Sequence, residues 1–433
     1  MGWSGKSCST AVQGPLTFHQ DGPISYALTD LTERDQAEYY AGFANSVLWP
    51  LCHYRIDLTE FARRDVEGYF RVNRLFADRL VPLVQKDDLI WVHDYHLLPL
   101  ARELRRQGVK NRIGFFMHIP WPAPDVFLTL PIAERILRDM TSYDLLGFQT
   151  PTDADNFRRC LEQNGLAWNV SDDPNLFQIP GHSFRIGSFP IGIDCAHFAR
   201  QGSQALKNPH LRGLRANIGT RQLLVGVDRL DYSKGLLQRL NGYRRFLRDE
   251  PKQAGQVSYI QIAPKSRSEV PEYHALEREV AELSGQIQGE FGQLDWSPVR
   301  YVNRAFSQQM LAGLFCMANV ALVTPLRDGM NLVAKEFVAA QNPEDPGVLV
   351  LSRFAGAAGE LGSGALVINP YDEEAIAKAI SRAVEMPLEE RQQRHASMFV
   401  ALNKNSVFDW CDGFLQRLVD GGSGKRDETF LNL

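Results

Sequence analysis

Short apolar runs alternate with longer helical patterns along almost the whole of this 433-residue chain. The runs show little polar alternation, as is typical of strands buried on both faces of a parallel sheet. In chain order they are residues 89–92, 113–117, 145–148, 184–193, 223–227, 259–263, 300–302, 320–323, 348–351 and 365–368. Helical patterns between them include residues 66–83, 272–283, 332–340 and 373–384. The alternation predicts an α/β fold with doubly wound parallel sheets.

The strands form two series, separated by a polar stretch of little periodicity at residues 200–221. The chain is also too long for one ordinary domain of about 100–200 residues. We therefore expect two Rossmann-like domains, residues 1–200 and 201–400, joined by that stretch as a linker. A helix over residues 401–420 could cross back over the hinge, and the glycine-rich tail 421–433 is expected to be disordered.

Composition excludes several classes of protein. The 47 Lys and Arg residues nearly balance the 51 Asp and Glu residues, which gives a net charge of −4. A general nucleic-acid binder is not expected, because such proteins need a basic face that releases counterions. No apolar run reaches about 18 residues, so no transmembrane helix is predicted. The six cysteines form no CxxC pair and no secretory signal opens the chain, which predicts a cytoplasmic protein with free thiols.

Charged and aromatic side chains gather near the predicted strand ends, where ligands bind in open α/β sheets. In the first domain His93 and Asp94 follow one strand, and His118 follows the next. Upstream of them, Tyr40 and Trp49 could form an aromatic wall against a sugar ring. The first domain is therefore predicted to hold an acidic and aromatic site for a polyhydroxy ligand.

The strand ends of the second domain carry positive charge. Arg229 and Lys234 follow one strand, and a glycine turn at residues 327–331 opens the helix over residues 332–340. Fixed cations and helix N-terminal N–H groups are what a diphosphate requires. Glu336, in the second turn of that helix, is placed to accept hydrogen bonds from sugar hydroxyls. The second domain is therefore predicted to bind a nucleotide diphosphate.

These residues also have structural explanations. Arg229 and Lys234 could be ion-pair partners of Asp228 and Asp231, and Trp49 could be a core residue. Taken singly, none of them identifies a site. Their joint position after strands is what favours one.

Two further features have ordinary explanations. His93 and His96 are three residues apart, but the segment lacks the HExxH pattern of a zinc-binding helix, so no metal site is predicted. A structural role for the histidine pair is favoured. Asp328 could be the turn residue and N-cap of the helix over residues 332–340.

At these positions the chain resembles trehalose-6-phosphate synthases, retaining glycosyltransferases of GT-B architecture that transfer glucose from UDP-glucose to glucose-6-phosphate. The resemblance runs from Gly2 to about Leu418, in the family's order and spacing. It rests on NSVLWP at 45–50, WVHDYHLLP at 91–99, DRLDYSKG at 228–235, TPLRDGMNLVAKE at 324–336 and VLVLSRFAGA at 348–357. It implies two Rossmann-like domains facing a cleft.

The resemblance also implies roles for individual residues. Arg229 and Lys234 would hold the donor's diphosphate, and Phe306 would lie near its uracil. Glu336 would bind the ribose, and His118 would contact the transferred glucose from the other domain. The rest of the implied donor site is Asp328, Gly329, Met330, Asn331, Leu332, Val333, Ala334 and Lys335. The implied acceptor site for glucose-6-phosphate is Tyr40, Trp49, Asp94 and Arg267, with Arg267 on the phosphate.

The implied mechanism is front-face attack by the acceptor hydroxyl while cations neutralise the departing UDP. The catalytic set would be Arg229, Lys234, Asp94 and His118. No carboxylate matches a covalent nucleophile, and the family needs neither a metal nor another cofactor. Domain closure would exclude water and so favour transfer over hydrolysis.

Two alternatives stay open. One keeps the fold with another acceptor, such as glycerol-3-phosphate or an aminocyclitol phosphate. The other is a catalytically impaired homologue that binds sugar phosphates. The identity of the donor base and the presence of a homo-oligomer are also open.

The chain departs from the family's pattern at its start. Family members carry a strand and a glycine loop before the Gly-Trp-Ser-Gly segment, which here directly follows Met1. The departure predicts weak acceptor binding or low stability compared with an N-terminally extended form. Equal activity and heat stability of the two forms would contradict this expectation.

Overall fold

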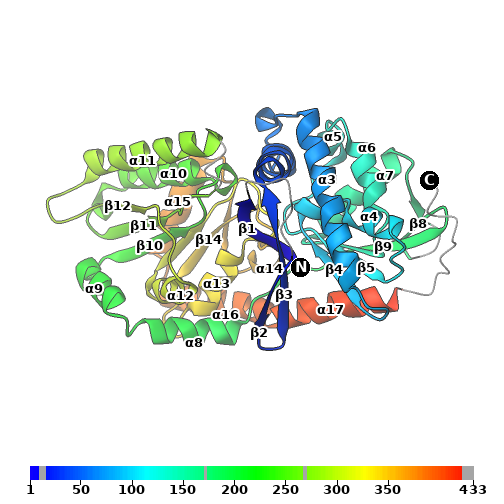
Figure 1. Ribbon diagram of the computed structural model, residues 1–433. Helices are drawn as coiled ribbons and strands as arrows, with labels where there is room; N and C mark the ends of the chain where they lie inside the picture. Colours follow the sequence, from blue (N-terminus) through cyan, green and yellow to red (C-terminus); the bar gives the residue numbers. More distant parts are fainter. Residues whose placement is uncertain (9–15, 170–172, 267–270, 422–433) are drawn as a thin grey trace. The chain divides into compact units, whose positions relative to one another are not determined.

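The computed structural model describes residues 1–8, 16–169, 173–266 and 271–421. The chain forms two compact units (Figure 1). Unit 1 comprises Met1–Phe189 and Gly413–Leu433, and unit 2 comprises Pro190–Asp412. The first division thus falls after Phe189, whereas the sequence pattern suggested residue 200. Apart from Gly421, the tail expected to be disordered lies outside the described residues.

The sheet of unit 2 has six parallel strands in the order β12-β11-β10-β13-β14-β15. Their bounds are β10 Gln222–Val227, β11 Val257–Ile262, β12 Val299–Val302, β13 Val320–Val323, β14 Val348–Ser352 and β15 Leu366–Ile368. Each coincides with an apolar run of the sequence to within about two residues. The four central strands β10, β11, β13 and β14 are almost entirely buried, which explains why they lack polar alternation.

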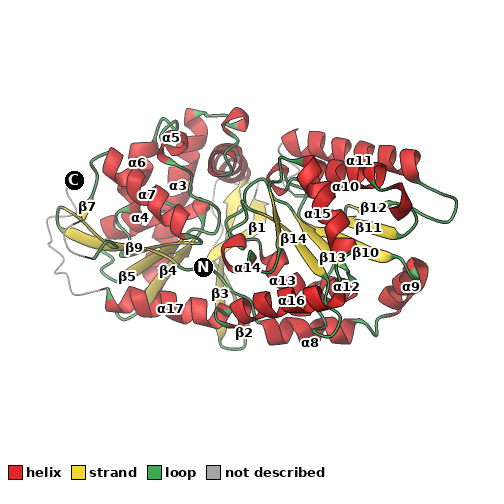
Figure 2. Cartoon of the chain, turned by 180° about the vertical axis from the view of Figure 1, so that it is seen from behind, coloured by secondary structure: helices red, strands yellow, loops and turns green. Residues whose placement is uncertain are grey.

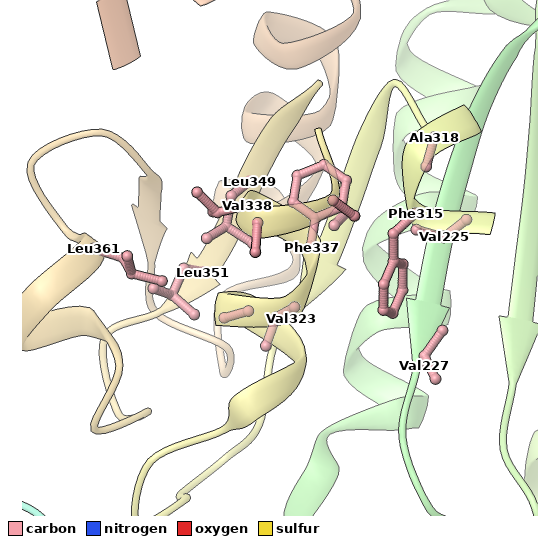
Figure 3. Close-up of a cluster of buried hydrophobic side chains, with 14 of the residues drawn as sticks. Val225, Val227, Phe315, Ala318, Val323, Phe337, Val338, Leu349, Leu351 and Leu361 are labelled. Atoms are coloured by element: carbon pink, nitrogen blue, oxygen red, sulfur yellow. The ribbon is translucent and has the colours of Figure 1, made fainter. Parts of the chain in front are cut away.

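Helices cover both faces of this sheet (Figure 2). They are α8 Cys195–Ala205, α9 Pro209–Ile218, α10 Leu236–Asp249, α11 Pro271–Phe291, α12 Gln308–Met317, α13 Leu332–Ala340, α14 Ala358–Leu361, α15 Glu373–Val384 and α16 Leu388–Asn403. Val225 of β10 joins a buried cluster with Phe315 of α12 and Phe337 of α13 (Figure 3). Leu224 joins a second cluster with side chains of α10 and α15. Alternate residues of β10 therefore serve opposite layers of the doubly wound unit.

Residues 200–221, expected to be a linker, are largely helical and belong to unit 2. The second half of α8 and the whole of α9 lie within this stretch. Each helix buries a few residues, among them Phe198, Ala205 and Leu211, and exposes a polar face. Gly202 of α8 packs closely on α12, since a Cβ at this position would lie 2.5 Å from the Cys316 sulfur. The narrow apolar stripe explains why the stretch resembled a linker.

Unit 1 contains two sheets. The larger has the order β4-β5-β6-β9-β8-β7, in which β4, β5, β6 and β9 are parallel and β8 and β7 are antiparallel. The smaller has the order β1-β3-β2. The bounds are β1 Gly2–Cys8, β2 Thr17–Asp21, β3 Ile24–Thr32, β4 Leu89–His93, β5 Arg112–Phe116, β6 Leu145–Phe148, β7 Trp168–Asn169, β8 Leu176–Ile179 and β9 His182–Ser188. The sequence pattern missed β1, β2, β3 and β7, because these strands carry many exposed or polar residues, and it also missed the four-residue strand β8.

The helices of unit 1 pack around the larger sheet. They are α1 Glu33–Asp35, α2 Trp49–Cys52, α3 Arg63–Leu80, α4 Leu100–Arg106, α5 Pro124–Phe127, α6 Ala133–Met140 and α7 Pro151–Gln163. A π-helical segment, η1 Gln36–Leu48, precedes α2. Its pattern continues at its end, where the Trp49 N–H donates to the Ala44 carbonyl five residues back.

The chain returns to unit 1 within α17, Val407–Asp420, which lies along the sheet on the side opposite α3 and α4 (Figure 1). The ring of Phe414 is fully buried and stacks on Trp91, with centroids 4.4 Å apart and planes at 9°. A Cβ on Gly114 or Gly147 would lie 2.7 Å from this ring. Glycines in β5 and β6 therefore make the space that Phe414 fills.

Phe414→Leu is expected to lower the free energy of unfolding by about 1–2 kcal/mol, because part of the space over the two glycines becomes empty. Thermal and urea unfolding measure the change. Phe408→Leu is the matched control, since Phe408 lies on the same helix with 63% of its surface exposed. Equal losses in the two variants would contradict the packing role of Phe414.

Candidate functional site

In unit 2, the segment after β10 is held by buried hydrogen bonds. Asp231 is fully buried, and its carboxylate accepts from the Ser233 N–H at 2.9 Å and from the Tyr273 hydroxyl at 2.9 Å. Gly235 has a φ of 64°, and a Cβ there would lie 2.2 Å from the Thr324 carbonyl oxygen. Both features fix the turn that contains Lys234.

A buried arginine also holds the turn that contains Lys234. Arg239 of α10 is fully buried and donates to Asp228 at 2.6 Å, to the Lys234 carbonyl at 3.2 Å and to the Thr324 hydroxyl at 2.9 Å. Burial raises the pKa of Asp228, against the opposing charge of Arg239. Asp228 therefore pairs with Arg239. Arg239 was not among the residues expected at the site, because it lies inside a helical pattern and only its burial reveals its role.

Lys234 pairs with the glycine turn rather than with Asp231. Its ammonium lies 2.5 Å from Asp328 Oδ2, and the Asn331 side chain donates to the same oxygen at 3.0 Å. The Lys234 side chain is 11% exposed. Arg229, two residues after β10, is exposed. The two strand ends thus bring Lys234 and Asp328 together, as a joint site requires.

The glycine turn, residues 327–331, delivers the N-terminus of α13. Asn331 has a φ of 77°, and its side-chain oxygen accepts from the Ala334 N–H at 3.3 Å. Asn331, not Asp328, is therefore the N-cap. Gly356 permits close packing on this turn, because a Cβ there would lie 1.9 Å from the Gly329 carbonyl oxygen. The turn is rigid and ends in a capped helix.

The motif residues along α13 differ in exposure. Met330 and Ala334 are buried in the core. Leu332 is exposed, and Val333 is half-buried. Glu336 is half-buried, and burial raises the pKa of its carboxyl group while a hydrogen bond from Gln308 opposes the shift. The Lys335 side chain is fully buried. Lys335 as a whole residue has no accessible surface, so a ligand does not reach it in this structure.

Phe306 lines an apolar cavity of about 530 Å³ in unit 2. Arg304 lies over its ring, 4.8 Å from the centroid. Apolar side chains of β11, α9 and α12 complete the walls, among them Ile260, Leu211 and Leu314. The cavity has the size and polarity for a planar heterocycle.

In unit 1, a histidine pair marks the ends of β4 and β5. His93 Nδ1 lies 3.0 Å from His118 Nε2. Burial lowers the pKa of His93, and burial together with the neighbouring His93 lowers the pKa of His118 to about 4. Asp94 adopts a φ of 73°, and its carboxylate accepts from the His118 N–H at 3.3 Å. A positive φ at a non-glycine residue is frequent at functional sites.

The lowered pKa of His118 predicts how the stability of the protein depends on pH. Its value in the folded state lies below the ordinary 6.5, so its contribution is present above pH 6.5 and is lost as the pH falls toward 4. We expect the melting temperature of His118→Gln to fall less steeply over this range than that of the wild type. Between pH 6.5 and pH 4, the loss in the free energy of unfolding should be smaller in the variant than in the wild type by about 3 kcal/mol. His19→Gln is the control, because His19 is exposed, and parallel curves for wild type and His118→Gln would contradict the prediction.

The predicted aromatic wall is only partly accessible. Tyr40 is half-buried and stacks on His96 with ring centroids 5.6 Å apart. Trp49 is 3% exposed and packs between His53 and Tyr95. This packing agrees with the alternative explanation of Trp49 as a core residue. Arg267, expected on the acceptor phosphate, lies outside the described residues.

The described parts of the chain hold neither a cluster of metal-ligating side chains nor a membrane-spanning helix. Among those residues, no group of three or more His, Cys, Asp or Glu side chains could hold a metal ion. Within the same ranges, no helix has both the length and the apolar character needed to span a membrane.

Comparison with known proteins gives concordant matches. Residues 1–420 match the family model described as Glycosyltransferase family 20. A trehalose-6-phosphate synthase from Sinorhizobium fredii is 54% identical over 419 residues, which cover 97% of this chain and 90% of that protein.

Solved structures agree with these matches. The crystal structure of a UDP-forming alpha,alpha-trehalose-phosphate synthase from Burkholderia xenovorans in complex with glucose-6-phosphate has a TM-score of 0.93 at 45% identity, covering 96% of this chain and 92% of that one. A structure described as trehalose-6-phosphate from E. coli bound with UDP-2-fluoro glucose has a TM-score of 0.92 at 46% identity, covering 96% and 91%. By sequence and by fold, the chain belongs to glycosyltransferase family 20.

Proposed function

We propose that the chain transfers glucose from UDP-glucose to glucose-6-phosphate with retention, forming α,α-trehalose-6-phosphate and UDP. The observation that carries this proposal is that the Lys234 ammonium lies 2.5 Å from Asp328, in the turn that leads to the capped N-terminus of α13. A cation beside helix N–H groups suits a diphosphate. Relatives described as trehalose-phosphate synthases, one with glucose-6-phosphate bound, support the same substrates.

In unit 2, the proposed donor site follows the geometry of the two loops. Lys234 and Arg229 hold the diphosphate and neutralise the charge that develops as UDP departs. Asp328 and the backbone of residues 329–332 hold the transferred glucose. Glu336 accepts hydrogen bonds from the ribose hydroxyls.

The uracil is proposed to lie against Phe306. The apolar cavity of about 530 Å³ that Phe306 lines supports this position for the uracil. Val333, Ala334 and Lys335 complete the proposed donor segment as the helix residues between Leu332 and Glu336.

In unit 1, we propose Tyr40, Trp49, Asp94 and Arg267 as the residues that bind glucose-6-phosphate. Asp94 has the strained backbone and the hydrogen bond to the His118 N–H that support such a role. His118 contacts the transferred glucose through a neutral imidazole, because its pKa is near 4.

The proposed chemical step is front-face attack on the donor carbon by the acceptor hydroxyl. The side chains of unit 2 supply positioning and charge neutralisation, and no covalent sugar–enzyme intermediate is required. We also propose that the reaction needs no metal ion or other cofactor and takes place in the cytoplasm.

UDP release by the purified chain tests the proposal. We expect release from UDP-glucose to depend on glucose-6-phosphate and to accompany a disaccharide phosphate of the correct mass. Release that depends instead on glycerol-3-phosphate or an aminocyclitol phosphate would replace the acceptor in the proposal. UDP binding without any turnover would identify a sugar-phosphate-binding homologue.

A further inference from the structure

Lys335 of α13 has no exposed side-chain surface, although its neighbour Glu336 is half-buried. Its ammonium donates to the Ile191 carbonyl at 2.7 Å and forms an ion pair with Glu360 of α14. Burial lowers the pKa of Lys335, and the charge of Glu360 opposes that shift. Burying an ammonium is costly, so its partners must be held in place for the charge to persist.

The partner segment is where the chain enters unit 2. Unit 2 begins at Pro190, and the Pro190 carbonyl accepts from the Asn405 side chain at 2.5 Å. The same Asn405 amide also lies 3.3 Å from Glu360. Lys335, Glu360 and Asn405 therefore form a continuous polar network around residues 190–191.

Gly192 shows how tightly this segment is seated. A Cβ at this position would lie 1.9 Å from the Asn405 carbonyl oxygen. Asn405 lies between α16 and α17, shortly before the chain leaves unit 2 after Asp412. The entering and leaving segments of unit 2 are thus packed against each other and tied to α13.

We propose that Lys335 is a positioning residue that, with Glu360 and Asn405, fixes the entry segment of unit 2 to the helix carrying the donor site. α13 begins at the turn that contains Asp328 and carries Glu336. Loss of this tie would let α13 shift relative to the entry segment of unit 2, and the donor-site residues that α13 carries would shift with it. This inference rests on the proposed function for its kinetic consequence, but not for its structural one.

Lys335→Met tests the tie, because methionine fills the buried channel without the charge. We expect amide hydrogen exchange of residues 191–193 to accelerate at least about tenfold. With UDP-glucose and glucose-6-phosphate, kcat should fall about tenfold, while the Kd for UDP stays within about twofold. Lys378→Met is the matched control, since the Lys378 side chain is 75% exposed.

A second variant separates this role from simple destabilisation. Asn405→Ala should reproduce the fall in kcat, and the double variant should lose little more than either single variant, because both act through one network. A loss of UDP affinity of tenfold or more, with unchanged exchange, would overturn the proposal and make Lys335 a donor contact. Lower melting temperature with unchanged kcat would overturn it in favour of a purely structural role. If the wild type itself shows no turnover, the proposed function fails, and the exchange measurement still decides the tie.

Discussion

Lys234→Met is expected to lower kcat/KM for UDP-glucose by about 10²–10³-fold. The substitution removes the cation that lies 2.5 Å from Asp328 and leaves that carboxylate, 14% exposed, without its ammonium partner. In the proposed site, Asp328 would then repel the diphosphate instead of being neutralised. Steady-state kinetics of UDP release measure the loss, and UDP titration separates binding from turnover.

The control is Lys252→Met, because the Lys252 side chain is 67% exposed in surface ion pairs of the same unit. Its kcat/KM should match the wild type. The double variant Lys234→Met, Asp328→Asn should regain part of the UDP affinity, because the repulsive charge is gone. A loss below threefold in Lys234→Met would remove Lys234 from the diphosphate site.

Arg239→Met is expected to lower the free energy of unfolding by about 3–5 kcal/mol, the usual effect of leaving a buried charge without its partner. Arg239 and Asp228 are both buried, and Arg239 also holds the Lys234 carbonyl and Thr324. The variant should therefore be less active as well as less stable, because the turn that carries Lys234 loses its hydrogen bond from Arg239. Urea unfolding measures the change.

The pH dependence of this loss has a definite sign. Burial already raises the pKa of Asp228, and removing Arg239 raises it further. Such a carboxyl group has a higher pKa in the folded state than in the unfolded state. It therefore destabilises the fold more as the pH rises from the unfolded-state pKa through the folded-state pKa. The deficit of Arg239→Met should therefore be smaller at pH 5 than at pH 8.

Two further variants complete this test. Asp228→Asn combined with Arg239→Met should recover part of the stability. Arg248→Met, on the same helix with a 58% exposed side chain, should leave the stability close to that of the wild type. A deficit of Arg239→Met that is independent of pH would contradict the role assigned to Asp228.

The parallel strands that carry the site could be predicted closely. β6 and β13 coincide with their apolar runs, and β10 and β11 differ from theirs by one or two residues. Strands buried on both faces must be apolar throughout, so a short segment of sequence carries the whole signal. The α/β fold with parallel sheets and the resemblance to trehalose-6-phosphate synthases were likewise confirmed.

Amphipathic and exposed elements were harder to predict. α8 and α9 were expected to be a linker, because each buries only a narrow stripe. β2 has no buried residue, so its pairing with β3 leaves no hydrophobic pattern to detect. The last helix was expected over residues 401–420, whereas α16 ends at Asn403 and α17 begins at Val407.

The sequence by itself determined the strand series, the family and the candidate residues at the strand ends, because parallel strands deliver their following residues to one edge. Only the tertiary structure decided which charges are paired. Lys234 could have paired with Asp231 by proximity in the chain, yet it contacts Asp328, 94 residues away. Lys335 and Glu336 are adjacent in one motif, but a turn of about 100° per residue directs them to different surroundings. Burial and partner choice depend on long-range packing, which no local pattern of residues records.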